Sequence, residues 1–311
     1  MRAAVLWELG RPRCGDFDDP VPGAGQAVVE VAAAGLNHLD VAKASGGFYL
    51  GPPPVPSVVG GDGVGTVEGG RRVFFDETVS PYGSMAERTL VDAAALIDVP
   101  DGVDDTLAAA LGNSGLAAWL ALSWRARLEP GETVLVLGAT GAVGMVAVQA
   151  ARLLGAGRVV AAGRSAERLR RAQELGADAV VDLTELEGHP GALRDAAGDG
   201  FDVIVDPLWA APALAAMHAA AHGGRLVQVG QAAGSEVALP APLVRGRFLT
   251  ILGHANFHAP VDVRAGAYGA MARHAAAGEL TLDAERVPLR DIEPAWKRQI
   301  AGPPHKLVIV P

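Results

Sequence analysis

The chain has 311 residues, of which half are apolar and a fifth are charged, and its formal net charge is −9. That length suffices for two ordinary domains or one large one. Because the net charge is negative and no basic run occurs, we expect no nucleic-acid partner. A single cysteine, Cys14, excludes an internal disulfide and any zinc site built from cysteines. The first residues, MRAAVLWELGRP, lack a long apolar run, so we interpret them as a first strand and expect a cytoplasmic protein.

Residues 1 to about 100 contain short Val-rich runs separated by Gly and Pro, which predict a small, irregular β-domain. From Asp104 the sequence is rich in Ala and Leu and helical in pattern, with an interruption at residues 112–115. We interpret that interruption as the passage between two domains. The expected strands of the β-domain are 2–6, 26–33, 63–68, 72–75 and 85–91.

Residues 133–162 predict a strand, a glycine turn, a helix and a second strand. The aliphatic run 134–137 is followed at once by Gly138, Gly141 and Gly144, and an apolar helical segment then extends to about residue 154. Glycines at such a turn let backbone N–H groups and the positive end of the helix approach a pyrophosphate. This order of elements predicts a dinucleotide site at the turn.

The same stretch could be mistaken for a membrane span, because residues 133–151 carry no charge. Three glycines, the amide of Gln149 and the change from strand to helical periodicity favour a buried strand and helix of an α/β protein instead. We therefore expect no membrane segment.

Strand and helix patterns continue to alternate after the glycine turn, which predicts a doubly wound parallel sheet. Two histidines, His218 and His222, are four residues apart on an expected helix, but with no third ligand we expect no metal there. A final helix at 261–277 and a strand at 307–310 return to mixed elements that complete the first domain. The expected elements of the sheet are helices 167–175 and 211–221 and strands 179–182, 201–205, 225–229 and 248–252.

The end of the second strand of a dinucleotide fold selects the cofactor, since an acid there binds the ribose diol and excludes a 2′-phosphate. In this chain the strand ends in Gly163, Arg164 and Ser165, with Arg168 one turn further on, and no carboxylate occupies the strand end. A guanidinium suits a phosphate monoester. The sequence therefore predicts NADP(H) as the cofactor.

Five stretches together resemble the medium-chain dehydrogenase/reductase superfamily, in its zinc-free quinone oxidoreductase and enoyl reductase branch. They follow the order of that family over nearly the whole chain. The resemblance implies a mostly β, GroES-like catalytic domain at residues 1–108 and 254–311 and a Rossmann NADP(H)-binding domain at 109–253. The stretches are AAGLNHLDVAKASGGFY, VVGGDGVGTVE, YGSMAERTLV, GATGAVGMVAVQAARLLGA, and FDVIVDP followed by GGRLVQVG.

The zinc alcohol dehydrogenases of this superfamily hold their metal with a Cys, a His and a second Cys. The matching positions here are Asn37, Gly61 and Asn113, which do not supply that ligand set. The positions of the alcohol proton relay carry Leu39 and Ala42, which cannot transfer protons. The resemblance therefore implies no catalytic metal.

By the same resemblance, Asn37 and Asp40 lie near the nicotinamide. Asn37 would donate to a substrate carbonyl, and Asp40 either shares in that site or fixes its loop. Many relatives place Tyr in this loop; this chain has Ala42 at the first such position and offers Tyr49 near the second. His38 is a further candidate because it titrates near neutrality, and His254 is a candidate proton donor.

The remaining predicted site residues surround the dinucleotide. By resemblance, residues 253–256 form a wall at the nicotinamide carboxamide, and residues 229–231 end a strand that faces the cofactor. The expected cofactor-binding residues are Thr140, Gly141, Ala142, Val143, Gly144, Gly163, Arg164, Ser165, Arg168, Val229, Gly230, Gln231, Gly253, His254, Ala255 and Asn256.

These features predict an NADPH-dependent reductase that transfers hydride, without a metal, to a quinone or an α,β-unsaturated carbonyl compound. One alternative is a reductase dedicated to one ketone or enoyl intermediate of a biosynthetic pathway. Another is a weakly active NADPH-binding sensor or partner module. By resemblance we expect a homodimer joined through the sheet edge at residues 247–253.

Overall fold

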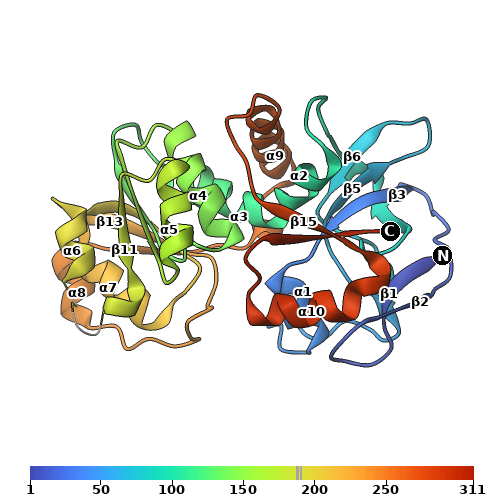
Figure 1. The fold of residues 1–311 in the computed structure, drawn as a ribbon, viewed down its shortest axis with the longest axis horizontal. Helices are drawn as coiled ribbons and strands as arrows, with labels where there is room; N and C mark the ends of the chain where they lie inside the picture. Colours follow the sequence, from blue (N-terminus) through green and yellow to red (C-terminus); the bar gives the residue numbers. More distant parts are fainter. Residues whose placement is uncertain (187–188, 190) are drawn as a thin grey trace. The chain divides into compact units, whose positions relative to one another are not determined.

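The computed structural model describes residues 1–186, 189 and 191–311, and they form two compact units. Unit 1 comprises Met1–Ser114 and Val261–Pro311, and unit 2 comprises Gly115–Pro260. Both chain ends belong to unit 1 (Figure 1). The first join lies a few residues beyond the expected limit of 108, because the helix of residues 105–110 packs on strands of unit 1. The second join lies after Pro260, where residue 253 was expected.

Unit 1 is built mainly of strands. A three-stranded sheet has the order β2-β1-β4, and a larger sheet has the order β15-β16-β3-β5-β6-β8, with β7 paired to β3. The elements are β1 Arg2–Leu6, β2 Arg13–Asp16, β3 Gln26–Gly35, α1 His38–Ala44, β4 Ser57–Val58, β5 Gly63–Thr66, β6 Arg72–Phe75, β7 Arg88–Asp92, η1 Ala93–Ala95, β8 Ile97–Asp98, α2 Asp105–Ala110, α9 Val261–Ala276, β15 Ala284–Pro288, η5 Leu289–Asp291, α10 Ile292–Ala301 and β16 Lys306–Val310.

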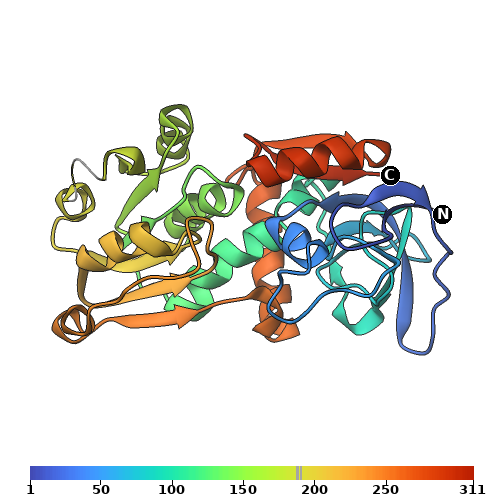
Figure 2. The same ribbon diagram turned by 90° about the horizontal axis from the view of Figure 1, so that it is seen from below.

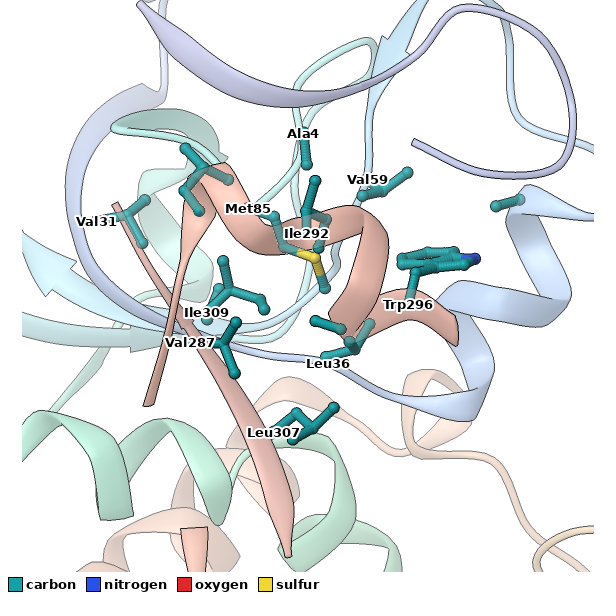
Figure 3. Close-up of a cluster of buried hydrophobic side chains, with 14 of the residues drawn as sticks. Ala4, Val31, Leu36, Val59, Met85, Val287, Ile292, Trp296, Leu307 and Ile309 are labelled. Atoms are coloured by element: carbon teal, nitrogen blue, oxygen red, sulfur yellow. The ribbon is translucent and has the colours of Figure 1, made fainter. Parts of the chain in front are cut away.

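The core of unit 1 joins the two ends of the chain. Trp296 and Ile292 of α10 pack with Leu36, which follows β3, and with Leu307 and Ile309 of β16 (Figure 3). Because β16 pairs with β3, the last strand completes the sheet that the first third of the chain begins. Helix α10 also packs beside α1, as Figure 2 shows. The C-terminal segment is therefore an integral part of this unit, as the sequence predicts.

Unit 2 contains a six-stranded parallel sheet with the order β11-β10-β9-β12-β13-β14. Helix α3 carries the chain across the boundary from unit 1. The elements are α3 Asn113–Leu120, the π-helical η2 Ala121–Ala126, β9 Thr133–Val136, α4 Ala142–Leu153, β10 Arg158–Gly163, α5 Ala166–Glu174, β11 Ala179–Asp182, η3 Leu183–Glu185, α6 Ala192–Ala197, β12 Phe201–Asp206, α7 Ala210–His218, β13 Ala220–Gln228, α8 Ala241–Arg247, β14 Thr250–Gly253 and η4 Asn256–His258.

Both faces of this sheet are covered. Leu135 of β9 belongs to a buried cluster with Ala213 and Met217 of α7, while Val134 and Val136, which alternate with it, are also fully buried. Successive side chains of a strand point to opposite faces, so continuous burial is the pattern of a parallel sheet between two helical layers. In the parts of the chain that the structure describes, none of the helices has the length and apolar character that crossing a membrane requires.

One expected helix is shorter than predicted. Helix α7 ends at His218, and β13 already begins at Ala220 and continues through Gly223 and Gly224. A Cβ on Gly224 would lie 2.9 Å from the carbonyl oxygen of Phe201, so this glycine permits close approach to β12 instead of ending a helix. The prediction that His218 and His222 share a helix face is therefore wrong, because His222 lies in the strand.

Candidate functional site

The glycine turn after β9 is too crowded for any other residue at two of its positions. A Cβ on Gly144 would lie 2.3 Å from the carbonyl oxygen of Gly138, and Gly138 itself has a φ of +59°. A Cβ on Gly163, at the end of β10, would lie 2.5 Å from Cγ2 of Thr140. The close packing of the turn against α4 and against the end of β10 therefore excludes a side chain at positions 144 and 163.

Helix α4 begins directly after this turn, at Ala142, with Gly141 as its N-cap and no acidic residue in its first turn. The first N–H groups of a helix have no partner within the helix, and the helix dipole is positive at this end. The backbone at Gly141, Ala142 and Val143 therefore forms a cradle suited to a pyrophosphate. These residues fit the dinucleotide that the sequence predicts.

The end of β10 presents positive charge to the surface. Arg164 is exposed, and Ser165 caps α5 by accepting a hydrogen bond from the backbone N–H of Arg168 at 3.4 Å. Glu167 is the acidic residue of the first turn of α5, but no carboxylate stands at the strand end itself. The donor set of Arg164 and Ser165 fits a phosphate monoester.

The segment after β13 is tied to the segment after β12. The backbone N–H groups of Val229 and Gly230 both donate to the carbonyl of Asp206, at 2.8 and 3.3 Å, and the Gln228 side chain donates to the carbonyl of Gly230. A Cβ on Gly230 would lie 2.9 Å from the carbonyl oxygen of Pro207. These bonds fix residues 229–231 at the carboxyl end of the sheet, where ligands bind in open α/β folds.

The predicted nicotinamide wall, residues 253–256, follows β14. The backbone N–H of His254 donates to the carbonyl of Gln228, and the carbonyl of Gly253 accepts from Nε of Arg125 at 3.1 Å. Burial lowers the pKa of His254 to about 4, and its Nε2 lies 3.1 Å from Oδ1 of Asn256. The His254 ring is therefore neutral near pH 7, which leaves it poorly suited to donate a proton.

Asn37 lies at the centre of a buried polar cluster in unit 1. Its Nδ2 donates to Oδ1 of Asp62 at 2.7 Å and to the carbonyl of Gly35 at 3.1 Å. Both amide hydrogens of Asn37 are thus used inside the protein. In this arrangement the side chain has none left for a substrate carbonyl, which is the role that the sequence predicts for it.

Three further residues of the cluster, Asp62, Ser114 and Lys306, were not predicted as site residues. Lys306 Nζ donates to Oδ1 of Asn37 and to Oγ of Ser114, and Asp62 Oδ2 accepts the backbone N–H of Asn113 at 2.9 Å. Burial raises the pKa of Asp62 to about 6, while the Lys306 ammonium opposes that shift. The available signal was a single charged residue at the head of the apolar strand KLVIV.

Asp40 belongs to the same cluster and closes the first turn of α1. Its Oδ2 accepts the backbone N–H of Asn37 at 2.8 Å, which is the reciprocal bond of a capping box. Burial raises the pKa of Asp40. This position gives Asp40 a defined role in holding its loop, which is one of the two roles that the sequence allows.

The other two catalytic candidates lie outside the cluster. His38 is exposed at the start of α1, and desolvation followed by the charge of Lys306 lowers its pKa. Tyr49 lies on the loop after α1 with 69% of its surface exposed, and its ring is 4.5 Å from that of Phe48. The structure therefore brings Asn37 and Asp40 together and leaves Tyr49 on the surface of unit 1.

The residues at the three positions that match metal ligands do not fit a zinc ion. The side-chain amide of Asn37 and the backbone N–H of Asn113 both donate to Asp62, and Gly61 has no side chain. None of the three residues supplies a thiolate or an imidazole. Among residues 1–186, 189 and 191–311, no group of three or more His, Cys, Asp or Glu side chains is placed to hold a metal.

Two family models match the chain. One, described as the alcohol dehydrogenase GroES-like domain, matches residues 23–101, and the other, described as zinc-binding dehydrogenase, matches residues 142–266. The mouse protein named quinone oxidoreductase-like protein 2 is 34% identical over 268 residues, which are 81% of this chain and 74% of the mouse protein. The first model falls within unit 1, and the second covers most of unit 2 and continues into the first residues of the C-terminal part of unit 1.

Two other similar proteins differ from each other in how much of their own length matches this chain. A mycocerosic acid synthase-like polyketide synthase of Mycobacterium tuberculosis is 32% identical over 225 residues, which are 69% of this chain and 10% of that much longer one. The quinone oxidoreductase of Thermus thermophilus, solved alone and in complex with NADPH, superposes with a TM-score of 0.86 at 32% identity over 100% of both chains. The second match extends over both units.

Proposed function

Since the chain belongs to the medium-chain dehydrogenase/reductase superfamily, in its quinone oxidoreductase branch, we propose that it is an NADPH-dependent reductase of quinones or α,β-unsaturated carbonyl compounds. The observation that carries this proposal is the glycine turn, where Gly138, Gly144 and Gly163 leave room for backbone alone. A turn of this kind, opening α4, is built for a dinucleotide.

The preference for NADPH is supported by the end of β10. Arg164 is exposed there beside the hydroxyl of Ser165, and a carboxylate that would repel a 2′-phosphate is missing from the strand end. Charge-assisted hydrogen bonds from a guanidinium to a phosphate are among the strong polar contacts of proteins. The complex of the Thermus thermophilus relative with NADPH agrees with this choice.

When bound, NADPH supplies the hydride, so the protein has to hold the cofactor and receive an electron-poor acceptor. Residues 141–143 would hold the pyrophosphate, and residues 229–231 and 253–256 would line the dinucleotide at the carboxyl ends of the strands. An acceptor such as a quinone gains little from a strong acid, because its own carbonyl groups stabilise the charge that develops. This suits a protein in which His254 is neutral and the Asn37 amide is fully engaged.

A second candidate is a reductase dedicated to one enoyl or ketone intermediate of a biosynthetic pathway. The match to a polyketide synthase over 69% of this chain favours it. Both candidates need the same cofactor site and differ only in the acceptor. A weakly active NADPH-binding sensor remains as the third outcome of the experiment below.

The test measures cofactor binding and turnover separately. Dissociation constants for NADPH and NADH come from titration of the cofactor's fluorescence, and turnover comes from loss of NADPH absorbance with a panel of quinones, enones and enoyl thioesters. We expect tighter binding of NADPH and turnover with quinones or enones. Turnover with enoyl thioesters alone would favour the pathway reductase, and NADPH binding without any turnover would favour the sensor.

A further inference from the structure

Lysine is rare in this protein, and one of its lysines is buried. The sequence contains three lysines, Lys43, Lys297 and Lys306, among 26 basic residues. Lys306 is 6% exposed and begins β16, whereas Lys297 on α10 is exposed. A buried lysine is rare in proteins unless it is paired, so the surroundings of Lys306 have to compensate its charge.

The ammonium of Lys306 has a partner for each of its three hydrogens. Nζ donates to the carbonyl of Leu36 at 2.9 Å, to Oγ of Ser114 at 3.3 Å and to Oδ1 of Asn37. An ammonium only donates and a carboxylate only accepts. Lys306 on one side and Asp62 on the other therefore dictate which way the Asn37 amide faces.

The charges around Lys306 are balanced within unit 1. Burial lowers the pKa of Lys306, and the carboxylates of Asp62 and Asp40 oppose that shift. Together with burial, the ammonium lowers the pKa of His38, the charge of Lys43 opposes the burial-raised pKa of Asp40, and the charge of Asp62 adds to the raised pKa of Asp76. Well-packed apolar residues often stabilise a core as well as a buried ion pair does, so stability alone is a weak reason to keep this lysine.

The cluster links segments that are far apart in the sequence. Asp62 joins the Asn37 side chain to the backbone of Asn113, and Lys306 joins Asn37 to Ser114. Positions 37 and 113 are two of the three that match metal-ligand positions of the zinc alcohol dehydrogenases. In this chain the carboxylate of Asp62 bridges them, and the Lys306 ammonium contacts Asn37 and Ser114, the residue after Asn113.

Building on the proposed function, we propose that Lys306 is a positioning residue of the reductase. Its ammonium fixes the Asn37 amide in one orientation and, through it, keeps Asp62 and the Asn113 backbone in place. The segment of residues 35–40 then has a single conformation during turnover. Without the ammonium, Oδ1 of Asn37 retains only the 3.4 Å contact from the Ser114 hydroxyl and the capping-box contact with the Asp40 backbone. The amide is then held mainly through its Nδ2, by Asp62 and the carbonyl of Gly35, and its orientation is less firmly fixed.

The first experiment does not depend on turnover. With ¹⁵N-labelled lysine, NMR resolves three ammonium groups, and Lys43 and Lys297 serve as internal controls. We expect slow hydrogen exchange for Lys306 alone, with a change in its signal in the variant Asp62→Asn. Equal, fast hydrogen exchange for all three lysines would overturn the proposal. The proposal would also fail if the NMR signal of the Asn37 side-chain amide were the same in Lys306→Met as in wild type.

The second experiment compares Lys306→Met, Lys306→Arg and the control Lys297→Met in NADPH-dependent reduction of a quinone or enone. We expect Lys306→Met to lower kcat about tenfold or more, a loss of transition-state stabilisation, with the NADPH dissociation constant unchanged. Lys306→Arg should restore part of kcat, and Lys297→Met should match wild type. A merely structural lysine would lower the amount of folded, NADPH-binding protein and leave kcat per bound NADPH unchanged, which would overturn the proposal.

If Lys306→Met does not fold, Ser114→Ala removes one contact of the ammonium and should give a smaller loss of kcat in the same direction. An unchanged kcat in Ser114→Ala together with unchanged Asn37 amide signals would count against the proposal. If the wild-type protein reduces no substrate of the panel, the proposed function fails. The exchange of the Lys306 ammonium and the Asn37 amide signal then still decide whether Lys306 fixes Asn37.

Discussion

Arg264 of α9 donates from Nη1 to Oδ2 of Asp76 at 2.8 Å, and both side chains are almost fully buried. Removing one member of such a pair leaves a buried charge without compensation, at a cost of about 3–5 kcal/mol. We therefore expect Arg264→Met to lower the free energy of unfolding by about that amount, as measured by urea denaturation. Arg290→Ala is the control, since Arg290 is exposed and 3.9 Å from Asp291, and it should change stability little. A loss in Arg264→Met no larger than in the control would contradict the prediction.

Arg164 should determine the preference for NADPH. Loss of a charge-assisted contact to the 2′-phosphate weakens binding by about 1.5–3 kcal/mol, or roughly 10- to 100-fold. We expect Arg164→Ala to raise the dissociation constant of NADPH by that factor and to leave that of NADH unchanged. Arg170→Ala, which removes an exposed arginine of helix α5 shortly after Arg164, is the matched control. Equal weakening of both cofactors by Arg164→Ala would exclude a 2′-phosphate contact.

Gly144 and Gly266 offer a matched pair of helical glycines. A Cβ on Gly266 of α9 meets nothing within 4 Å, whereas a Cβ on Gly144 of α4 would lie 2.3 Å from the carbonyl oxygen of Gly138. Alanine favours a helix over glycine by about 1 kcal/mol. Gly266→Ala should therefore raise the melting temperature slightly, and Gly144→Ala should lower it and weaken NADPH binding. NADPH affinity that survives in Gly144→Ala would show that the crowding at the turn is not needed for the cofactor.

His254 should make stability depend on pH in a defined direction. Its pKa in the folded protein is about 4, below the ordinary value of 6.5, so between these values the unfolded chain binds a proton that the folded one does not. The free energy of unfolding should thus fall as pH is lowered from about 6.5 to about 4, by up to roughly 3 kcal/mol from this residue. His254→Phe should flatten that slope, and the exposed control His305→Gln should not. Parallel slopes in wild type and His254→Phe would refute the assignment.

The homodimer expected from the sequence would form at β14, the outer strand of the sheet in unit 2. Phe248, just before this strand, is 72% exposed and has a φ of +53°. An open strand edge next to an exposed aromatic ring is a surface that pairs readily with another chain. Light scattering should show a dimer in wild type and a monomer in Phe248→Glu. Val21→Glu, at a residue 81% exposed in unit 1, should remain dimeric, and a monomeric wild type would end this proposal.

The elements that sequence patterns predict best are those in which local and tertiary preferences agree. Helix α4 differs by one residue at its end from the expected helix, because glycines bound it and its apolar face is continuous. Helices α10, α1, α6 and α8 were not expected. The last three are only six or seven residues long, and the periodicity of such short segments is weak.

The site residues also fall into those that the sequence predicts from local patterns and those that only the tertiary fold brings together. The glycine turn could be read from spacing, since its requirement is local and steric. The buried cluster could not, because Asn37, Asp62, Ser114 and Lys306 meet only after β16 has paired with β3. The extension of β13 through Gly223 was missed for a similar reason. A glycine pair signals a helix end locally, whereas here its use depends on the approach of β12.

The contact between Gly163 and Thr140 limits how this protein could change its coenzyme. Replacing the arginine at position 164 alters only an exposed side chain, so selection or design can vary it without disturbing the sheet, whereas Ser165 also caps α5. Position 163 offers no such freedom, because any side chain there displaces Thr140 and with it the turn that every nicotinamide dinucleotide needs. A switch toward NADH would therefore have to be made one residue later in the chain than the strand end itself.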